Sequence, residues 1–489
     1  MMILLNIKNK TNEPVFKQIY SQIIVFIESG VLKPGDKLPS SRKLAEQLGV
    51  NRTTVYRAYE ELWSKGYTES SPGSYSIIRK RAEVISLQDI QSFSTLDWNK
   101  KFTRTSRMLG NDLLKHRNQK CLNDSIDFAS FSPDPRLMPI ERFRKCINEV
   151  ILEEGNTVFD YSDWMGYLPL RKYTAEQMRR HSVSVSEEEI LITNGCQNGI
   201  ELILKLLVNP GDKIITEMPC YASAIPLFNQ HAKKIIGIPF TENGMNLVDF
   251  EKAIRKEHPA VFYTIPNFHN PTGITTSQAY REKLLGLCEK YKLPVIEDGF
   301  SEEMKYFGKN ILPIKSMDRN NLVFYLGTFS KIMFPGLRVG WIAADKECIG
   351  TLGYMKRAGE LSGVAFTQAA LHKFCEKGYY ELHIKKMHKV YKKRMHTAIS
   401  ALKEFVPNDK FGFTKPFGGY TIWVEAKNKK IDEELLIEEI KKHGVTVSPG
   451  KIYFPGKHNY AAFRISIARV DENEIVEGIK RIGKTLKKI

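Results

Sequence analysis

The stretch GTFSKIMFPGLRVGW, residues Gly327 to Trp341, places one lysine among groups that can bind a phosphorylated ligand. Lys331 follows the apolar, strand-like segment Leu322 to Leu326, so we expect its amine at the carboxyl end of a strand, where open α/β sheets bind ligands. Three neighbouring side chains can contact a phosphate: Thr328, Ser330 and Arg338. An amine in this setting suits pyridoxal phosphate as the cofactor.

A second phosphate-binding element is predicted from ILITNGCQNGIELILKLLVNPGD, which begins at Ile190 and ends at Asp212. The run has the pattern of a strand, a glycine turn and an amphipathic helix. Backbone N–H groups of Gly195, Cys196 and Gln197 would then face an anion from the helix N-terminus. Such a turn is also common as a purely structural element.

The runs EMPCY, NFHNPTG and LPVIEDGF follow in the order of the corresponding motifs in fold-type I aminotransferases, and the chain resembles that family. The resemblance makes Tyr221 the ring that stacks on the pyridine and Asn270 the partner of the phenolic oxygen. It makes Asp298, rather than the adjacent Glu297, the carboxylate that keeps the pyridine nitrogen protonated. Relatives often carry a tyrosine where this chain has Phe300, which leaves full transamination in question.

AAFRISIA, near the C-terminus, predicts a strand that carries one arginine among apolar residues. A buried guanidinium is costly without an anion, and Arg464 matches the family's arginine for the α-carboxylate of an amino acid. Pairing with a nearby acid is the alternative. The resemblance extends over Ile126 to Ile489 and implies that Tyr161 reaches the phosphate of the neighbouring subunit in a dimer.

The sequence before residue 80 predicts three helices. The first follows Pro14 and has apolar residues on one face at every fourth position: Val15, Ile19, Ile23 and Ile27. Ser40 and Asn51 are predicted to cap the next two helices, which are separated by a turn at Gly49. Four residues of the third helix are expected to face inward: Val55, Ala58, Tyr59 and Leu62. Residues 14 to 78 resemble the GntR-type winged helix-turn-helix.

The resemblance and the polar pattern of the third helix predict a DNA-binding surface. Its exposed candidates gather at the start of that helix, where recognition helices meet base edges: Arg52, Thr53, Thr54, Tyr56 and Arg57. Arg42 is expected beside them, and arginine can bind guanine bidentately. A wing turn is predicted in SSPGSY, although Tyr75 departs from the usual small residue of the family.

Composition fits a protein with one small and one large domain. The 489 residues contain 42% hydrophobic and 26% charged residues and have a net charge of +18, which suits a polyanionic partner. Residues 1 to 80 supply only +5 of this charge. The seven cysteines form no CxxC pair, and no signal peptide, long apolar run or metal-ligand cluster is evident, so we expect a cytoplasmic protein without a metal or a membrane anchor.

A winged helix-turn-helix joined to an aminotransferase-like domain is the layout of MocR/GabR transcriptional regulators, which the chain resembles. We expect the DNA-binding domain at residues 1–80, a linker at 81–124 with one short helix around 98–114, and an α/β fold-type I effector domain at 125–489. As a random coil the linker would span roughly 35 to 40 Å, which allows a domain-swapped homodimer.

The resemblance implies a regulator that binds double-stranded operator DNA and holds pyridoxal phosphate on Lys331 as an aldimine. A small amino compound would displace the lysine and act as effector. Ser223 stands where relatives that sense γ-aminobutyrate place an arginine, which favours an α-amino acid or a simple amine. Two alternatives stay open: an active aminotransferase with an attached DNA-binding domain, and a sensor of pyridoxal phosphate itself that controls vitamin B6 supply.

Overall fold

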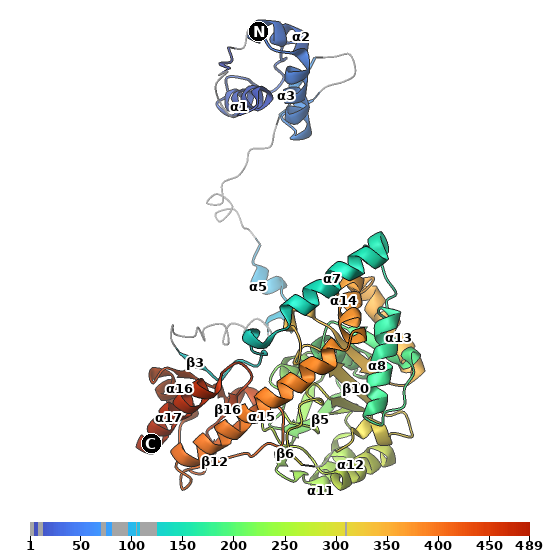
Figure 1. Cartoon of the computed structure of the whole chain (residues 1–489), viewed down its shortest axis with the longest axis vertical. Coiled ribbons are helices and arrows are strands. Elements are labelled where there is room, and N and C mark those ends of the chain that lie inside the picture. Colours follow the sequence, from blue (N-terminus) through green and yellow to red (C-terminus); the bar gives the residue numbers. More distant parts are fainter. Residues whose placement is uncertain are drawn as a thin grey trace. The chain divides into compact units, whose positions relative to one another are not determined.

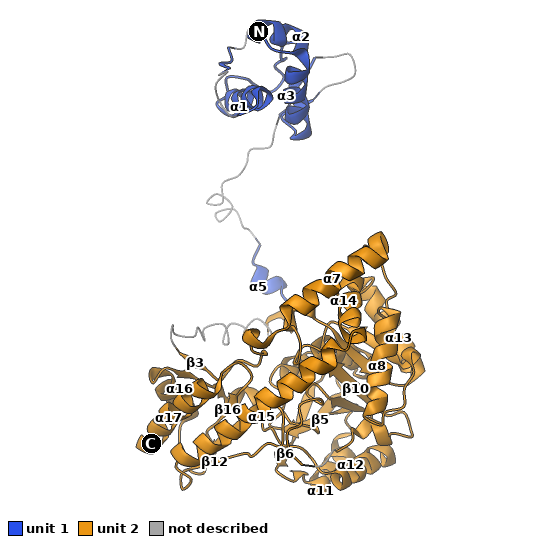
Figure 2. Cartoon of the chain, viewed as in Figure 1, with its two compact units in different colours: residues 1–102 blue, residues 103–489 orange. Residues whose placement is uncertain are grey.

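The computed structural model describes residues 4–7, 13–69, 75–80, 96–103, 105–107, 125–308 and 311–489. The chain forms two compact units, residues 1–102 and 103–489 (Figure 2). Most of the predicted linker and residues 70–74 of the predicted wing turn lie outside the described residues. Within the helix expected around residues 98–114, the structure describes α5, Trp98–Lys101, which ends at Phe102, and helical residues 105–107, whereas residues 104 and 108–114 lie outside the described residues.

Besides α5, the described part of the smaller unit contains three helices and a two-stranded antiparallel sheet, all before residue 80. Their bounds are Val15–Glu28 for α1, Ser41–Leu48 for α2, Arg52–Ser64 for α3, Thr68–Glu69 for β1 and Ile77–Ile78 for β2. The Ser40 hydroxyl accepts the Lys43 N–H at the start of α2, and the Asn51 side chain accepts the Thr53 N–H at the start of α3. Gly49 ends α2 in the left-handed conformation, as the turn between two short helices requires.

Apolar faces of the three helices form the core of this unit. Ile19 and Ile23 of α1 are buried, and the inward-facing residues predicted for α3 are confirmed: Val55, Ala58, Tyr59 and Leu62. Burying these side chains supplies most of the favourable free energy of folding in a domain of this size. The polar side of α3 is therefore left for contacts with a partner.

The larger unit is built on an eight-stranded sheet with the order β4-β11-β10-β9-β8-β5-β6-β7. The strands are β4 Ile190–Thr193, β5 Lys213–Met218, β6 Lys234–Thr241, β7 Gly244–Met245, β8 Val261–Thr264, β9 Val295–Asp298, β10 Val323–Thr328 and β11 Gly340–Ala343. Strands β6, β5, β8, β9 and β10 run parallel to one another, whereas β11 is antiparallel to both β10 and β4. The predicted α/β class is confirmed.

Helices cover both faces of this sheet (Figure 1). They are α7 Ile140–Glu154, α8 Leu168–Arg180, α9 Cys196–Leu207, α10 Ala224–His231, α11 Leu247–Glu257, α12 Gln278–Lys290, α13 Lys346–Glu360 and α14 Ala365–Glu376. Helices α9, α10 and α13 bury apolar residues against one face, and α11 and α12 bury theirs against the other. Alternate residues of each buried strand supply the two faces, as the strand period requires.

A second, four-stranded antiparallel sheet has the order β12-β13-β16-β15. Its strands are β12 Phe411–Phe413, β13 Thr421–Ala426, β15 Ser448–Pro449 and β16 Ala462–Ser466, while β14 Val445–Thr446 pairs with β3 Ile126–Asp127. Helices α15 Tyr379–Phe405, α16 Glu433–Lys442 and α17 Glu472–Lys488 pack beside it.

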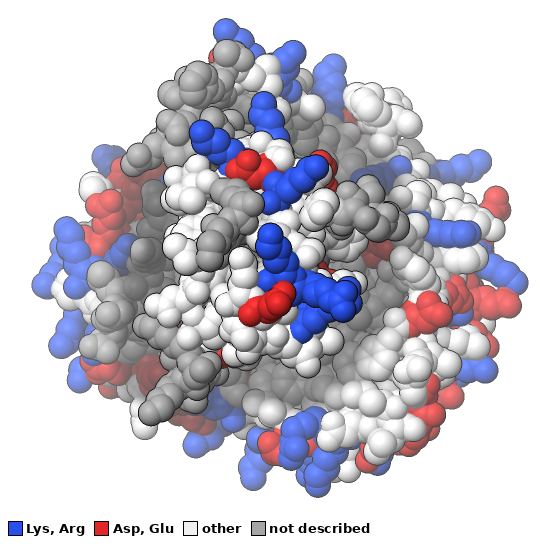
Figure 3. Space-filling view, turned by 90° about the horizontal axis from the view of Figure 1, so that it is seen from above, with Lys and Arg blue, Asp and Glu red and all other residues white. Residues whose placement is uncertain are grey.

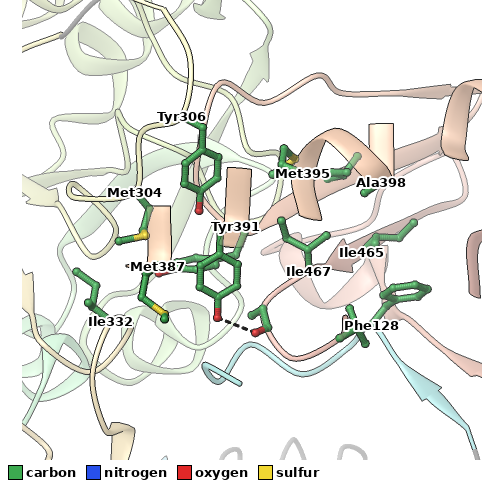
Figure 4. Packing of buried hydrophobic residues seen from close by; sticks show 14 of the residues in the cluster. Phe128, Met304, Tyr306, Ile332, Met387, Tyr391, Met395, Ala398, Ile465 and Ile467 are labelled. Carbon is green, nitrogen blue, oxygen red and sulfur yellow. Dashed lines mark hydrogen bonds between the residues drawn. The ribbon is translucent and has the colours of Figure 1, made fainter. Parts of the chain in front are cut away.

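One hydrophobic cluster connects the second sheet to the first. It includes Met387 and Tyr391 of α15, Ile465 of β16, and Phe128 directly after β3, and the Tyr391 hydroxyl donates to the Ala468 carbonyl at 2.8 Å (Figure 4). Close packing of this kind positions the loops that follow each strand. No helix in the described part of the chain is long and apolar enough to cross a membrane.

Candidate cofactor site and nucleic-acid interface

A pocket lies where the parallel strands of the large sheet end. The space between its lining residues that no atom fills is about 570 Å³, a volume that includes its open mouth. Its lining brings together residues from six separate segments: Phe131, Cys196, Gln197, Tyr221, Ile265, Asn270, Asp298, Phe300, Thr328, Ser330, Lys331, Pro335 and Arg338. Nine of the residues selected from the sequence thus line one pocket, while Gly195 lies next to Cys196 and Arg464 is bonded to Asn270.

The N-terminus of α9 forms one end of the pocket. Gly195 has a φ of 85°, and a Cβ there would lie 2.7 Å from Nη2 of Arg338, so glycine is required for this close approach. The guanidinium of Arg338 donates to the Asn194 carbonyl at 2.7 Å. Free N–H groups of the first helical turn and the Arg338 guanidinium together form an anion-binding corner.

Ser330 and Thr328 differ in what their hydroxyl groups offer. The Ser330 hydroxyl is buried and has no hydrogen-bond partner among the described residues, which fits a site for a phosphate oxygen. The Thr328 hydroxyl donates to the Val339 carbonyl at 3.1 Å and accepts the Ser330 N–H at 3.1 Å. Thr328 therefore shapes the turn after β10, whereas Ser330 has its hydroxyl proton available.

Lys331 reaches the pocket three residues after β10. Its Nζ donates to the Phe131 carbonyl at 3.2 Å, and its own carbonyl accepts the Tyr420 hydroxyl at 2.9 Å. Burial lowers the pKa of Lys331, and the nearby Arg464 guanidinium lowers it further, to about 8. A larger share of this amine is therefore neutral and nucleophilic than for an exposed lysine.

The two adjacent acids at the end of β9 point in opposite directions. Glu297 accepts the backbone N–H groups of Ile314 and Lys315 at 2.7 and 2.8 Å, away from the pocket. Asp298 lines the pocket and accepts the Tyr263 hydroxyl at 2.8 Å. Burial raises the pKa of Asp298 to about 6, a value at which the carboxylate is still mostly ionised at neutral pH. The alternation of the strand thus places Asp298, and not Glu297, in the pocket.

Arg464 lies on β16 and is 5% exposed. Its guanidinium donates to the Asn270 side chain at 3.3 Å and to the Ala129 carbonyl, while its Nε has no partner among the described residues. No described acid forms an ion pair with Arg464, so the alternative of a neighbouring carboxylate partner finds no support. A guanidinium held by neutral oxygens can still bind a ligand carboxylate.

Two other selected residues, Gln197 and Tyr161, differ in their surroundings. Gln197 donates through its side chain to the Ser223 carbonyl at 2.7 Å, which connects α9 to the start of α10. Tyr161 is 81% exposed and lies outside the pocket of its own chain.

Sequence reasoning did not select Ile265, Pro335, Phe131 or Tyr263, of which the last two contact polar groups of the site. Phe131 lies in an irregular loop after β3, where no periodic pattern distinguishes it. Tyr263, on β8, is buried and donates to Asp298, and its ring packs edge-on against Phe228. A tyrosine within an otherwise apolar strand was the available signal, because a buried hydroxyl needs a partner.

The smaller unit presents a polar surface on α2 and α3. Arg42, Arg52, Thr53 and Tyr56 are exposed there, and the Arg52 Nε donates to the Ser41 hydroxyl at 3.4 Å. Thr54 is half-buried, whereas Arg57 is exposed and its guanidinium lies 4.1 Å from the ring centre of Phe16.

Positive side chains are common on the face of the molecule drawn in Figure 3. Figure 3 shows Lys and Arg side chains gathered near the middle of that view, with Asp or Glu among them.

Within the part of the chain that the structure describes, no group of three or more His, Cys, Asp or Glu side chains could hold a metal ion. The six cysteines for which the structure gives a state are all free thiols.

Comparison with known proteins agrees with both units. Residues 126–482 match the aminotransferase class I and II family, and residues 16–75 match the gntR family of bacterial regulatory proteins. An aromatic-amino-acid aminotransferase of Thermococcus litoralis is 34% identical over 80% of this chain and 95% of its own. YdfD of Bacillus subtilis, described as an HTH-type transcriptional regulator, is 28% identical over 97% of both chains.

Solved structures extend this comparison. A multiple substrate aminotransferase of Thermococcus profundus superimposes with a TM-score of 0.75 at 32% identity, covering 80% of this chain and 99% of its own. The larger unit with its pocket is thus a fold-type I aminotransferase domain, a class whose cofactor is pyridoxal phosphate. The chain belongs to the aminotransferase class I and II family and, with its GntR-type DNA-binding domain, is a transcription regulator of the MocR/GabR type.

Proposed function

We propose that this regulator holds pyridoxal phosphate on Lys331 and senses a small amino compound in the same pocket. The observation that carries the proposal is the convergence of Lys331, Asp298 and the buried, unpartnered Ser330 hydroxyl on one cavity. Each of the three meets a different need of the cofactor: an amine for the aldehyde, a carboxylate for the ring nitrogen and a donor for the phosphate.

When bound, pyridoxal phosphate supplies an aldehyde that condenses with amines and a ring that withdraws electrons. The contribution of Lys331 is a neutral amine. With a pKa of about 8, about a quarter of the lysine is neutral at pH 7.5, against roughly 0.1% for an ordinary lysine. The amine can therefore attack an aldehyde without a separate base.

Other residues hold and orient the cofactor. The Ser330 hydroxyl, the Arg338 guanidinium and the first turn of α9 would bind its phosphate, and Tyr221 would stack on its ring. Asp298 would accept a hydrogen bond from the protonated ring nitrogen, since its carboxylate is fixed by Tyr263 and by the Phe300 N–H at 3.2 Å. Arg464 would bind the carboxylate of the effector beside Asn270.

A homodimer would complete this site, and fold-type I aminotransferases are typically dimers. Large apolar side chains on the unit are exposed around Tyr161: Leu152, Phe159, Tyr354, Leu361 and Val364 are each more than 60% exposed. Such residues favour a protein contact. Tyr161 would then reach the neighbouring subunit's phosphate, and the long linker permits exchange of the DNA-binding domains between subunits.

On DNA, the exposed start of α3 would enter the major groove, with Arg42 and Arg52 as candidates for base contacts. Thr53 and Tyr56 lie on the same surface. The effector can alter operator binding only if it binds one arrangement of the dimer more tightly than another. The observable result would be a change in the spacing or orientation of two DNA-binding domains.

Replacing the lysine tests the proposal. The Lys331→Ala and Lys331→Arg variants should lose the visible absorption of the bound cofactor after dialysis, and borohydride should attach no cofactor to either. Lys480→Ala changes an exposed lysine outside the pocket and is the matched control. A borohydride-stable adduct in Lys331→Ala would show that another amine holds the cofactor.

Aminotransferase activity is a second candidate function, because Lys331, Asp298 and Arg464 provide the same groups that an amino acid substrate needs. The absence of a hydroxyl at Phe300 argues against full turnover. Turnover of an amino donor with a keto acid would support activity. Operator binding that responds to pyridoxal phosphate alone, without an amine, would instead support a sensor of vitamin B6.

A further inference from the structure

Phe131 narrows the pocket at a point that the proposed cofactor chemistry does not use. Its ring centre lies 4.5 Å from Nζ of Lys331 and 4.9 Å from Cζ of Arg464. The ring thus borders both the amine proposed to hold the cofactor and the guanidinium proposed to hold a carboxylate. Attraction of each cation to the aromatic ring favours this position.

Two further aromatic rings support the Phe131 side chain. Phe300 lies at 5.7 Å with its ring tilted by 58°, and Tyr420 lies edge-on at 5.9 Å. Tyr420 is itself buried and fixed by its hydrogen bond to the Lys331 carbonyl. The Phe131 ring therefore has little room to turn away from the pocket.

The backbone that carries Phe131 is anchored on both sides. Before it, the Asp127 carboxylate accepts the N–H groups of Ala129 and Ser130 at 2.9 and 3.1 Å. After it, the Asp134 carboxylate forms a buried ion pair with Arg394 at 2.7 Å. Moving the ring by a shift of the whole loop would break these contacts.

We propose that Phe131 is a specificity-determining residue that limits the effector to an α-amino acid with a small side chain, the size of glycine or alanine. The inference rests on the proposed function, in which an amino compound meets the cofactor in this pocket. An α-amino acid that reaches both Lys331 and Arg464 carries its α-carbon past the Phe131 ring. A bulky substituent facing the ring would overlap it, and packed atoms accept little overlap.

A size series tests this on the full-length protein loaded with pyridoxal phosphate. Glycine, L-alanine, L-leucine and L-phenylalanine are titrated while the absorption of the cofactor is followed, and dissociation constants are compared as ratios. The wild type should bind alanine at least about tenfold more tightly than phenylalanine. Phe131→Ala should reduce that ratio about tenfold, whereas Phe131→Leu, which keeps most of the bulk, should stay close to the wild type.

Several results would overturn the inference. The inference would be wrong if the wild type bound phenylalanine as tightly as alanine. This result needs only the wild type, so it would hold even if Phe131→Ala failed to fold. A weaker affinity for phenylalanine in Phe131→Ala than in the wild type would mean that the ring is a stacking platform. If no amino compound changed the absorption of a cofactor that Lys331 holds, the proposed sensing function would fail, and this inference with it.

Discussion

The loop that carries Phe131 is anchored by the Asp134 carboxylate, which forms ion pairs with Arg136 and Arg394. We expect the two ion pairs to contribute very different free energies to the stability of the larger unit. Asp134 is 1% exposed; its ion pair with Arg394 at 2.7 Å is buried, because Arg394 is 4% exposed. Its pair with Arg136 at 3.0 Å involves a side chain that is 52% exposed. Removing one partner of a buried pair typically costs about 3–5 kcal/mol, whereas a solvated partner contributes about 0–1 kcal/mol.

We therefore expect Arg394→Met to destabilise the larger unit by about 3 kcal/mol, the low end of that range, because Asp134 keeps its hydrogen bonds from Arg136. With an unfolding entropy of about 2.1 cal/mol/K per residue, a unit of this size would lose about 4 °C in Tm. Arg136→Met, the matched control, should lose about 1 °C or less. Differential scanning calorimetry of the full chain, read at the transition of the larger unit, measures both.

The pH dependence of unfolding stability is a second test of the ion pair between Asp134 and Arg394. Burial alone would raise the pKa of Asp134, but hydrogen bonds from Arg136 and Arg394 outweigh burial and leave the pKa below its usual value. The stabilisation by Asp134 is therefore fully present above the usual pKa of an aspartate, and it is lost as the pH falls through the lowered pKa of Asp134.

A loss of Tm for Arg136→Met equal to or larger than that for Arg394→Met would refute the argument that the buried ion pair stabilises the larger unit more than the solvated one.

Four other predictions concern the two binding surfaces. Arg52→Ala should cost about 1–3 kcal/mol at the operator and much less on random DNA; equal losses would indicate phosphate contacts. Arg57→Ala should reduce binding to operator and to random DNA by more similar amounts than Arg52→Ala does, since the Arg57 guanidinium stacks on a ring of α1. Gel-shift titrations at fixed salt compare the two variants. Arg464→Ala should weaken an α-amino acid about tenfold or more and leave an amine without a carboxylate unaffected, as absorption titrations can show. Borohydride trapping of pyridoxal phosphate by the apoprotein should rise with pH through the pKa of Lys331, about 8; a midpoint near the ordinary lysine value would contradict the lowered pKa.

Local patterns predicted those parts of the molecule that depend on neighbours in sequence. The caps at Ser40 and Asn51 and the inward face of α3 follow from capping and helical periodicity, and the structure has all of them. The turn between β4 and α9 also follows from a short run of sequence. Each of these features depends on interactions between residues close in sequence, so contacts with distant parts of the chain change them little.

Features that depend on distant contacts could not be predicted in this way. Phe131 meets a lysine 200 residues away and an arginine on β16, and nothing in its irregular segment indicates either contact. The family resemblance selected Asp298 over Glu297, but local sequence alone does not show which side of β9 faces the pocket. Arg57 was selected for its place in the polar pattern of the third helix, and that pattern does not indicate the contact of its guanidinium with the ring of Phe16 on another helix.

The segment around Phe131 contacts both cations that we propose to bind ligands. Its carbonyl groups at Ala129 and Phe131 accept hydrogen bonds from Arg464 and Lys331, the two cations proposed to hold effector and cofactor. A ligand can shift an equilibrium between two arrangements only through contacts that differ between them. In the proposed function, a carboxylate bound by Arg464 would compete with the Ala129 carbonyl for that guanidinium, and would so act on the backbone that follows β3. In a regulator whose DNA-binding domain has to respond to occupancy of the pocket, a segment that contacts the ligand directly can change position on binding, whereas a distant loop cannot be displaced by the ligand itself.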